Sequence, residues 1–98
     1  MSRFILTDTA KADLLQIVEY LQERSPQATL AVAREIRLAL RQVAEFPGIG
    51  HARCDLTRRS VRFWSVYSYL IVYKPNTQPL QILRVLHGAR NIRRILSR

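Results

Sequence analysis

The spacing of apolar residues changes once along this chain of 98 residues, and that change limits the possible folds more than any other feature. Between residues 11 and 44, apolar side chains recur every three or four positions, as on one face of a helix. From Val61 onward they alternate with polar residues or run together, which is typical of strands. Helices followed by strands favour an α+β fold.

The first half of the chain predicts a short strand and then a helical hairpin. Residues 3–6 are typical of a strand, and a threonine or aspartate within residues 7–9 can cap a helix over residues 11–23. Ser25 and Pro26 end this helix and begin a second one, since proline is tolerated at the first helical position. We expect the second helix to run to about Ala44. The apolar stripes expected in the core are Leu14, Ile17, Val18 and Leu21, and then Val32, Ile36, Leu40 and Val43.

The second half predicts three strands, over residues 61–64, 69–73 and 80–86, and a last helix over residues 90–96. The whole prediction is one α+β domain over residues 1–98. It has an N-terminal strand, a helical hairpin packed on one face of a mostly antiparallel sheet (β-α-α-β-β-β), and a short C-terminal helix.

Two aromatic residues are neighbours on the first of these three strands. Phe63 and Trp64 must face opposite sides of the sheet, because side chains alternate along a strand. We expect one of them in the core and the other exposed to a partner. The alternative for the second residue is cover by a neighbouring helix or by the C-terminal segment.

The net charge of +9 lies entirely in the second half of the chain. Residues 1–49 contain six basic and six acidic residues, whereas residues 50–98 contain ten basic residues and a single acid, Asp55. Fourteen of the sixteen bases are arginine, whose planar guanidinium binds phosphate and carboxylate through two hydrogen bonds. This imbalance favours a polyanionic partner, either nucleic acid, an acidic protein or an anionic membrane surface.

Other features exclude several classes of protein. No apolar run approaches the roughly 20 residues of a membrane span, and the N-terminus lacks the pattern of a secretion signal. The single cysteine, Cys54, excludes an internal disulfide and suits a reducing cytosol. His51 and Cys54 are too few ligands for a zinc site. We therefore expect a cytoplasmic protein that has no metal or cofactor and no membrane partner.

Three stretches of the sequence resemble the RelE/ParE toxin superfamily of bacterial type II toxin–antitoxin modules. They are FPGIGHARCDL at 46–56, VRFWSVYSYLIVYKP at 61–75 and ILRVLHGARNIRRIL at 82–96. The last is the most specific, because it is similar to the family's Arg-Val-Leu-His-Gly-Arg-Asp/Asn ending. It is closer to the ParE branch than to the His-Tyr or Tyr ending of many nuclease members. The Val-Tyr-Ser turn at 66–68 replaces the glycine-containing turn common in the family, so a differently shaped loop is expected there.

The resemblance implies a toxin that blocks growth unless its antitoxin holds it. ParE-like members poison DNA gyrase, whereas RelE-like members cut mRNA in the ribosomal A site. It also implies a cognate antitoxin with an acidic, partly disordered segment, and a toxin–antitoxin complex that binds operator DNA through the antitoxin. We favour the gyrase inhibitor. The first alternative is a RelE-like endoribonuclease that is metal-independent and cuts mRNA on the ribosome. The second is a non-toxic module on the same fold that binds antitoxin or nucleic acid.

The gyrase-inhibitor and endoribonuclease hypotheses depend on overlapping sets of residues. A nuclease would need cations on the phosphate and an acid–base group, for which Arg62, Arg84, Arg90 and His87 are the candidates. Tyrosines 67, 69 and 73 would then stack a base. No second acid–base group accompanies His87, which could equally pack or cap the strand end, so the sequence argues against catalysis. The residues predicted to bind antitoxin or target are Arg53, Arg58, Arg59, Arg62, Trp64, Arg84, His87, Arg90, Arg93 and Arg94. The alternative for the arginines is a solvated loop and a solvated helix face.

Overall fold

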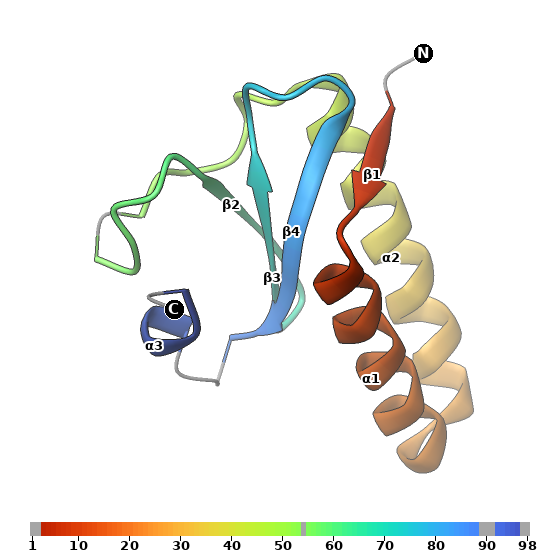
Figure 1. Cartoon of the computed structure of the whole chain (residues 1–98). Coiled ribbons are helices and arrows are strands. Elements are labelled where there is room, and N and C mark those ends of the chain that lie inside the picture. The colour runs from red at the N-terminus through yellow and green to blue at the C-terminus, as the bar shows by residue number, and fades with distance from the viewer. Residues whose placement is uncertain (1–2, 54, 89–91, 97–98) are drawn as a thin grey trace.

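A computed structural model describes residues 3–53, 55–88 and 92–96, and these form the expected α+β arrangement (Figure 1). The elements in chain order are β1 (Phe4–Leu6), α1 (Asp8–Arg24), α2 (Pro26–Glu45), β2 (Arg62–Val66), β3 (Tyr69–Lys74), β4 (Leu80–His87) and α3 (Ile92–Leu96). The sheet has the strand order β1-β4-β3-β2. Only the β1–β4 pair is parallel, so the prediction of a mostly antiparallel sheet is confirmed.

Side-chain caps define the helical hairpin as the sequence predicts. The Thr7 hydroxyl accepts a hydrogen bond from the N–H of Ala10 at 3.1 Å, and the helix begins at Asp8. The Ser25 hydroxyl accepts one from the N–H of Ala28 at 3.2 Å, with proline in the first turn of α2. Because Ser25 also ends α1, a single residue separates the two helices and holds them antiparallel.

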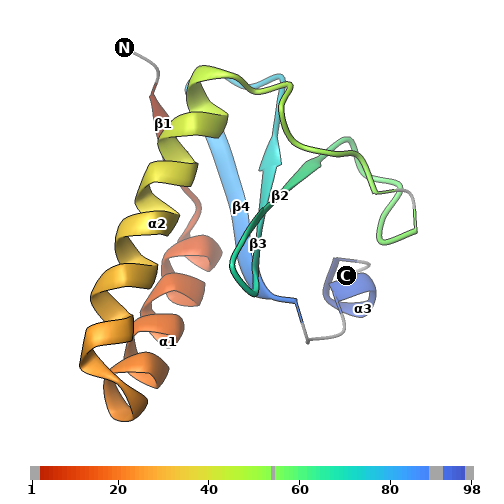
Figure 2. The ribbon, with the colours of Figure 1, turned by 180° about the vertical axis from the view of Figure 1, so that it is seen from behind.

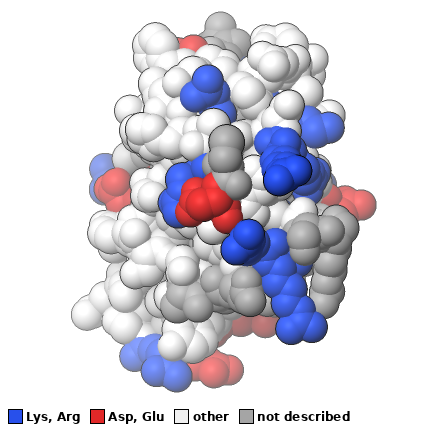
Figure 3. Space-filling view, turned by 90° about the vertical axis from the view of Figure 1, so that its left-hand side faces the viewer, with Lys and Arg blue, Asp and Glu red and all other residues white. Residues whose placement is uncertain are grey.

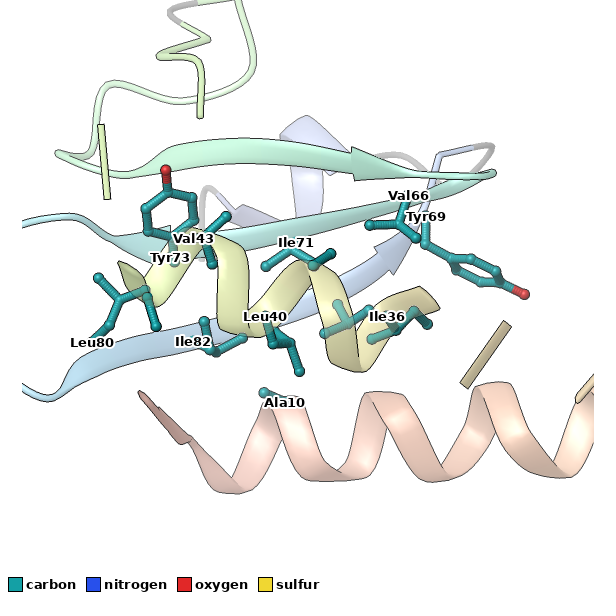
Figure 4. Close-up of a cluster of buried hydrophobic side chains, with 13 residues drawn as sticks. Ala10, Ile36, Leu40, Val43, Val66, Tyr69, Ile71, Tyr73, Leu80 and Ile82 are labelled. Atoms are coloured by element: carbon teal, nitrogen blue, oxygen red, sulfur yellow. The ribbon is translucent and has the colours of Figure 1, made fainter. Parts of the chain in front are cut away.

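The main hydrophobic core lies between the hairpin and the sheet. Ile71 and Tyr73 project from β3 toward α2, where they meet Leu40 and Val43 (Figure 4). Leu80 and Ile82 of β4 and Ala10 of α1 complete the cluster. Burial of each large aliphatic side chain contributes about 1.5–3 kcal/mol.

A second, smaller core lies on the opposite face of the sheet. It contains Val61, Phe63, Val72, Leu86, Ile92 and Leu96. Figures 1 and 2 show α1 and α2 on one side of the sheet and α3 on the other. The hairpin therefore covers one face, as expected, while α3 covers the second face.

Both faces of the sheet are covered, and this changes the prediction that one of the two neighbouring aromatic residues is exposed. Phe63 is 2% exposed in the second core. Trp64 is half-buried against the main core, and its ring stacks on His51 with centroids 6.4 Å apart. The expectation that one of the pair stands exposed is wrong, because each face of the sheet has its own cover.

Thr7, the N-cap of α1, continues the hydrogen bonding along the edge of β4 beyond the short strand β1. The N–H of Thr7 bonds to the carbonyl of Ile82 at 3.1 Å, and its hydroxyl donates to the carbonyl of Leu83 at 2.9 Å. The register of β3 and β4 shifts at this point, since Tyr73 pairs with Ile82 and Val72 pairs with Arg84. This bulge and the contact with α1 bring the second half of β4 beside the hairpin.

The apolar stripe expected on α1 is only half-buried. Leu14 and Ile17 pack against the main core, while Val18 and Leu21 lie toward the end of the hairpin. Together with α2 they line a groove of about 280 Å³. Among the residues that the structure describes, no helix is long and apolar enough to span a membrane.

The turn between β2 and β3 also departs from the ordinary backbone. Tyr67 has a φ of 53°, in the left-handed region that favours glycine. It is 66% exposed, and the following carbonyl of Ser68 accepts a hydrogen bond from the N–H of Gly88 at 2.7 Å. Tyr67 therefore occupies a backbone conformation that glycine would adopt more readily.

Candidate functional site

The loop at residues 51–60 lies beside α3, although the 31 residues 61–91 separate them along the chain. Leu56 packs against the second core, which includes Ile92 and Leu96 of α3. Arg59 lines a hollow together with Ile95 and Leu96. The two arginine-rich segments that the sequence singles out are therefore brought together on one side of the molecule.

This side of the molecule is strongly basic. Figure 3 looks onto it, and Lys and Arg side chains gather there. Its exposed arginines are Arg53, Arg58, Arg59, Arg93 and Arg94. We call the loop at 51–60 and α3 together the basic surface.

One arginine of the basic surface is neutralised within the protein. Nε and Nη2 of Arg53 donate to the two carboxylate oxygens of Asp55, at 2.9 and 2.8 Å. This hydrogen bonding lowers the pKa of Asp55, and the charge of Arg93 contributes a smaller electrostatic effect in the same direction. Because both side chains are exposed, solvent screens the pair, which contributes little to stability.

Arg84, predicted to hold a phosphate or a partner, is instead engaged by a carboxylate from α1. Its Nε and Nη2 donate to the two oxygens of Asp13, at 2.8 and 2.9 Å. Asp13 is 6% exposed and also accepts the N–H of Val85 at 3.0 Å. Hydrogen bonding to Asp13 raises the pKa of Arg84. The pair fastens α1 to the second half of β4.

The sequence reasoning overlooked Asp13, although a signal was present. Asp13 lies four residues before Ile17 and one before Leu14, so it belongs to the inward side of an amphipathic helix. A carboxylate at such a position needs a buried partner, since burying an unpaired charge is costly. The sequence does not indicate which base supplies it.

Arg62 and Tyr73 hold the turn that follows α2. Arg62 donates to the carbonyl of Gly50 at 2.7 Å. The Tyr73 hydroxyl donates to the carbonyl of Pro47 at 2.6 Å and accepts the N–H of Gly50 at 2.9 Å. A Cβ atom at Gly50 would collide with this hydroxyl, which explains the glycine. Tyr73 is fully buried, so the prediction that it stacks a base is wrong.

His87 lies at the exposed end of β4, where its ring meets the ring of Tyr69 edge-on with centroids 5.3 Å apart. Both line a hollow of about 380 Å³ between α1 and the sheet, together with Gln16, Tyr20 and Val85. Tyr69 is largely buried, and burial raises the pKa of its hydroxyl.

The two main nuclease candidates line different hollows. His87 belongs to the hollow beside Tyr69, whereas Arg84 lines the one between the start of α1 and α3, with Thr9 and Arg59. The structure does not gather Arg84 and His87 around one cavity where a scissile phosphate would lie. The use of either residue by a partner stays a prediction.

Some predicted residues lie outside the part of the chain that is described. Arg90 is one of the predicted binding residues outside it, and Cys54 also lies there. Within residues 3–53, 55–88 and 92–96, no three His, Cys, Asp or Glu side chains group closely enough to hold a metal ion.

Comparison with known proteins decides the family. Residues 4–92 match the family described as ParE toxin of type II toxin-antitoxin system, parDE. The chain belongs to the ParE toxin family. The resemblance to the ParE branch that the ending at residues 82–96 suggests is thereby confirmed.

Two curated ParE proteins of Caulobacter vibrioides align along nearly the whole chain. Toxin ParE1 is 32% identical over 94 residues, which cover 95% of this chain and 96% of ParE1. Toxin ParE3 is 28% identical over 93 residues, which cover 94% of this chain and 92% of ParE3. The two alignments therefore span nearly the full length of both relatives.

A solved structure has the same fold. It is described as the chromosomal ParDE TA system from P. aeruginosa, and its chain superposes with a TM-score of 0.71 at 21% identity. The match covers 89% of this chain and 96% of that one. At this identity the likeness establishes a shared fold.

Proposed function

We propose that this ParE-family protein blocks growth by binding and poisoning DNA gyrase in the cytoplasm. The observation that carries the proposal is the match to the ParE toxin family over residues 4–92. Gyrase poisoning belongs to the ParE-like members of the superfamily that the sequence resembles. The protein would act by binding, without cofactor or metal.

The environment of Arg84 supports binding rather than RNA cleavage. Metal-independent cleavage needs a cation that stabilises charge on the phosphate and an acid–base group beside it. Arg84 is committed to Asp13 through two hydrogen bonds, and His87 packs on Tyr69 in a different hollow. Recruiting Arg84 to a phosphate would weaken its bonds to a largely buried carboxylate.

A cognate antitoxin would neutralise the toxin by covering its basic side. We expect an acidic, partly disordered segment that becomes ordered across residues 53–64 and 84–98, and a complex that binds operator DNA through the antitoxin. Charge complementarity should steer this association, so its rate should fall as salt rises. A rate that does not change with salt would contradict this part of the proposal.

The central experiment is a gyrase assay with the purified protein. We expect loss of supercoiling and accumulation of cleaved DNA when the protein is in stoichiometric excess. Primer extension on cellular transcripts should show intact mRNA during growth arrest. Active gyrase with transcripts cut at the ribosome would establish the nuclease alternative instead. Harmless overexpression without antitoxin would favour the non-toxic module.

A further inference from the structure

We propose that the basic surface binds the phosphate backbone of duplex DNA, through Arg58, Arg59 and Arg93. The toxin would then contact the DNA that gyrase holds as well as the enzyme. The role at gyrase rests on the proposed function, whereas DNA binding by this surface can be tested without gyrase.

The first support is the concentration of charge from two distant segments. Arg58 and Arg59 are exposed on the loop, and Arg93 and Arg94 are exposed on α3. The two segments lie side by side, because Leu56 of the loop packs into the same small core as Ile92 and Leu96 of α3. Asp55 is the only acid in residues 50–98, and Arg53 already holds both of its carboxylate oxygens. The side chains of Arg58, Arg59 and Arg93 are exposed, so an external anion can reach them.

The second support is the kind of side chain that the surface lacks. The large apolar side chains that are exposed in the described part of the chain are Ile5, Leu15, Tyr20, Leu30, Leu38, Phe46 and Tyr67. None of these belongs to residues 51–60 or to α3. The interface with a folded protein usually has an apolar centre with aromatic anchors. Phosphate binding needs only charge and hydrogen-bond donors, so the composition favours nucleic acid over a folded protein.

The third support is a hollow beside the exposed arginines. It has a volume of about 400 Å³ and is lined by Arg59, Arg84, Thr9 and residues of α3. Arg59 and the Thr9 hydroxyl add donors on the rim. One phosphate of the DNA backbone could therefore lie in the hollow, while the adjacent phosphates contact the exposed arginines.

The test measures binding of a short fluorescent DNA duplex of arbitrary sequence, at several salt concentrations and without gyrase. Three phosphate contacts predict about a 40-fold loss of affinity between about 50 and 200 mM salt. The variant Arg58→Gln/Arg59→Gln should retain one contact and lose only about 3.5-fold over the same range. The matched control is Arg34→Gln/Arg41→Gln, which removes two exposed charges from α2 and should keep the salt dependence of the native protein. Thermal unfolding of both variants verifies that they fold.

The outcomes separate this inference from the proposed function. Absence of duplex binding at low salt, or equal loss in both double variants, would overturn the inference. If gyrase is unaffected while the variants separate on duplex DNA, the proposed function fails and DNA binding stands. If gyrase is poisoned equally by the native protein and by Arg58→Gln/Arg59→Gln, the contact with gyrase-held DNA is refuted.

Discussion

The two covers of the sheet differ in size, charge and stabilising forces. The hairpin brings two long helices and the larger core, and it belongs to residues 1–49, where charges balance. The opposite cover is a loop and the five-residue helix α3, and it carries much of the excess positive charge. Apolar burial stabilises the hairpin side. The basic cover combines a small core with mutual repulsion among arginines, which a bound anion would relieve.

The contrast separates the side with the larger apolar core from the side with the excess charge. The neutral hairpin side supports the architecture through its apolar packing. A basic side with few apolar contacts is suited to binding anions. The predictions below test this division, beginning with the contacts that support the hairpin side.

The largest expected effect is on the ion pair that fastens the hairpin to β4. Asp13→Asn should lower the free energy of unfolding by about 3 kcal/mol, because it leaves Arg84 without its carboxylate partner. Urea denaturation measures the change. The control is Glu19→Gln, an exposed acid of the same helix, which should change stability by less than about 0.5 kcal/mol.

A double variant separates the pair from its surroundings. Adding Arg84→Gln to Asp13→Asn should recover part of the lost stability, since no unpaired charge then remains. Equal stability of Asp13→Asn and Glu19→Gln would show that this pair does not support the hairpin side.

The next effect concerns the turn between the two covers. Tyr73→Phe should cost about 2 kcal/mol, because the buried N–H of Gly50 and the carbonyl of Pro47 both lose their partner. Tyr67→Phe removes the same chemical group from an exposed ring and should be nearly neutral. Equal unfolding midpoints for the two variants in urea would contradict this role for the buried hydroxyl.

Tyr73 also predicts an alkaline loss of stability. Burial raises the pKa of its hydroxyl, so the folded protein keeps this proton at a pH where the unfolded chain releases it. Its contribution is therefore complete below about pH 10, the ordinary tyrosine pKa, and declines as the pH rises through the folded-state value. Urea denaturation between neutral and alkaline pH should show a smaller decline for Tyr73→Phe. The same decline in both proteins would exclude Tyr73 as its source.

A moderate effect on the free energy of unfolding is expected when an anion binds the basic surface. Duplex DNA at ten times its dissociation constant should add about 1.4 kcal/mol to the free energy of unfolding. Differential scanning fluorimetry should show the rise for the native protein and for Arg34→Gln/Arg41→Gln at the same DNA concentration. A similar rise in Arg58→Gln/Arg59→Gln would place the DNA elsewhere on the molecule.

The smallest effect on stability is expected at Asp55. Asp55→Asn frees Arg53 from its pair, and both side chains are exposed, so unfolding should be unchanged within error. Duplex binding should gain one phosphate contact and steepen its logarithmic salt dependence by about 0.9. An unaltered salt dependence would mean that Arg53 lies away from the bound backbone.

Local features were predictable because neighbouring residues decide them. Thr7 and Ser25 cap the helices, and Pro26 begins the second one, through contacts that span only a few residues. The apolar run at residues 69–73 predicted the central strand β3. Its alternating side chains reach both cores, which local periodicity does not reveal.

The contacts that define the candidate site could not be predicted in the same way. Asp13 and Arg84 lie 71 residues apart, and nothing local selects that arginine among fourteen. Trp64 is covered by His51 and by the main core, which are distant in sequence or formed by several elements. The sequence also does not show that α3 packs on the face of the sheet opposite the hairpin. Each of these pairings required distant segments to be positioned in space.

By itself, the sequence determined the order of the helices and strands, the capped hairpin, the family resemblance and the confinement of the excess charge to residues 50–98. These properties depend on residue type and short-range spacing. Only the tertiary structure decided which arginines share a surface and which are held inside the protein. In the folded chain the loop at 51–60 packs beside α3, and Arg84 pairs with Asp13. Packing makes that division because burial requires a partner for every charge, whereas exposed arginines can remain hydrated until an anion binds.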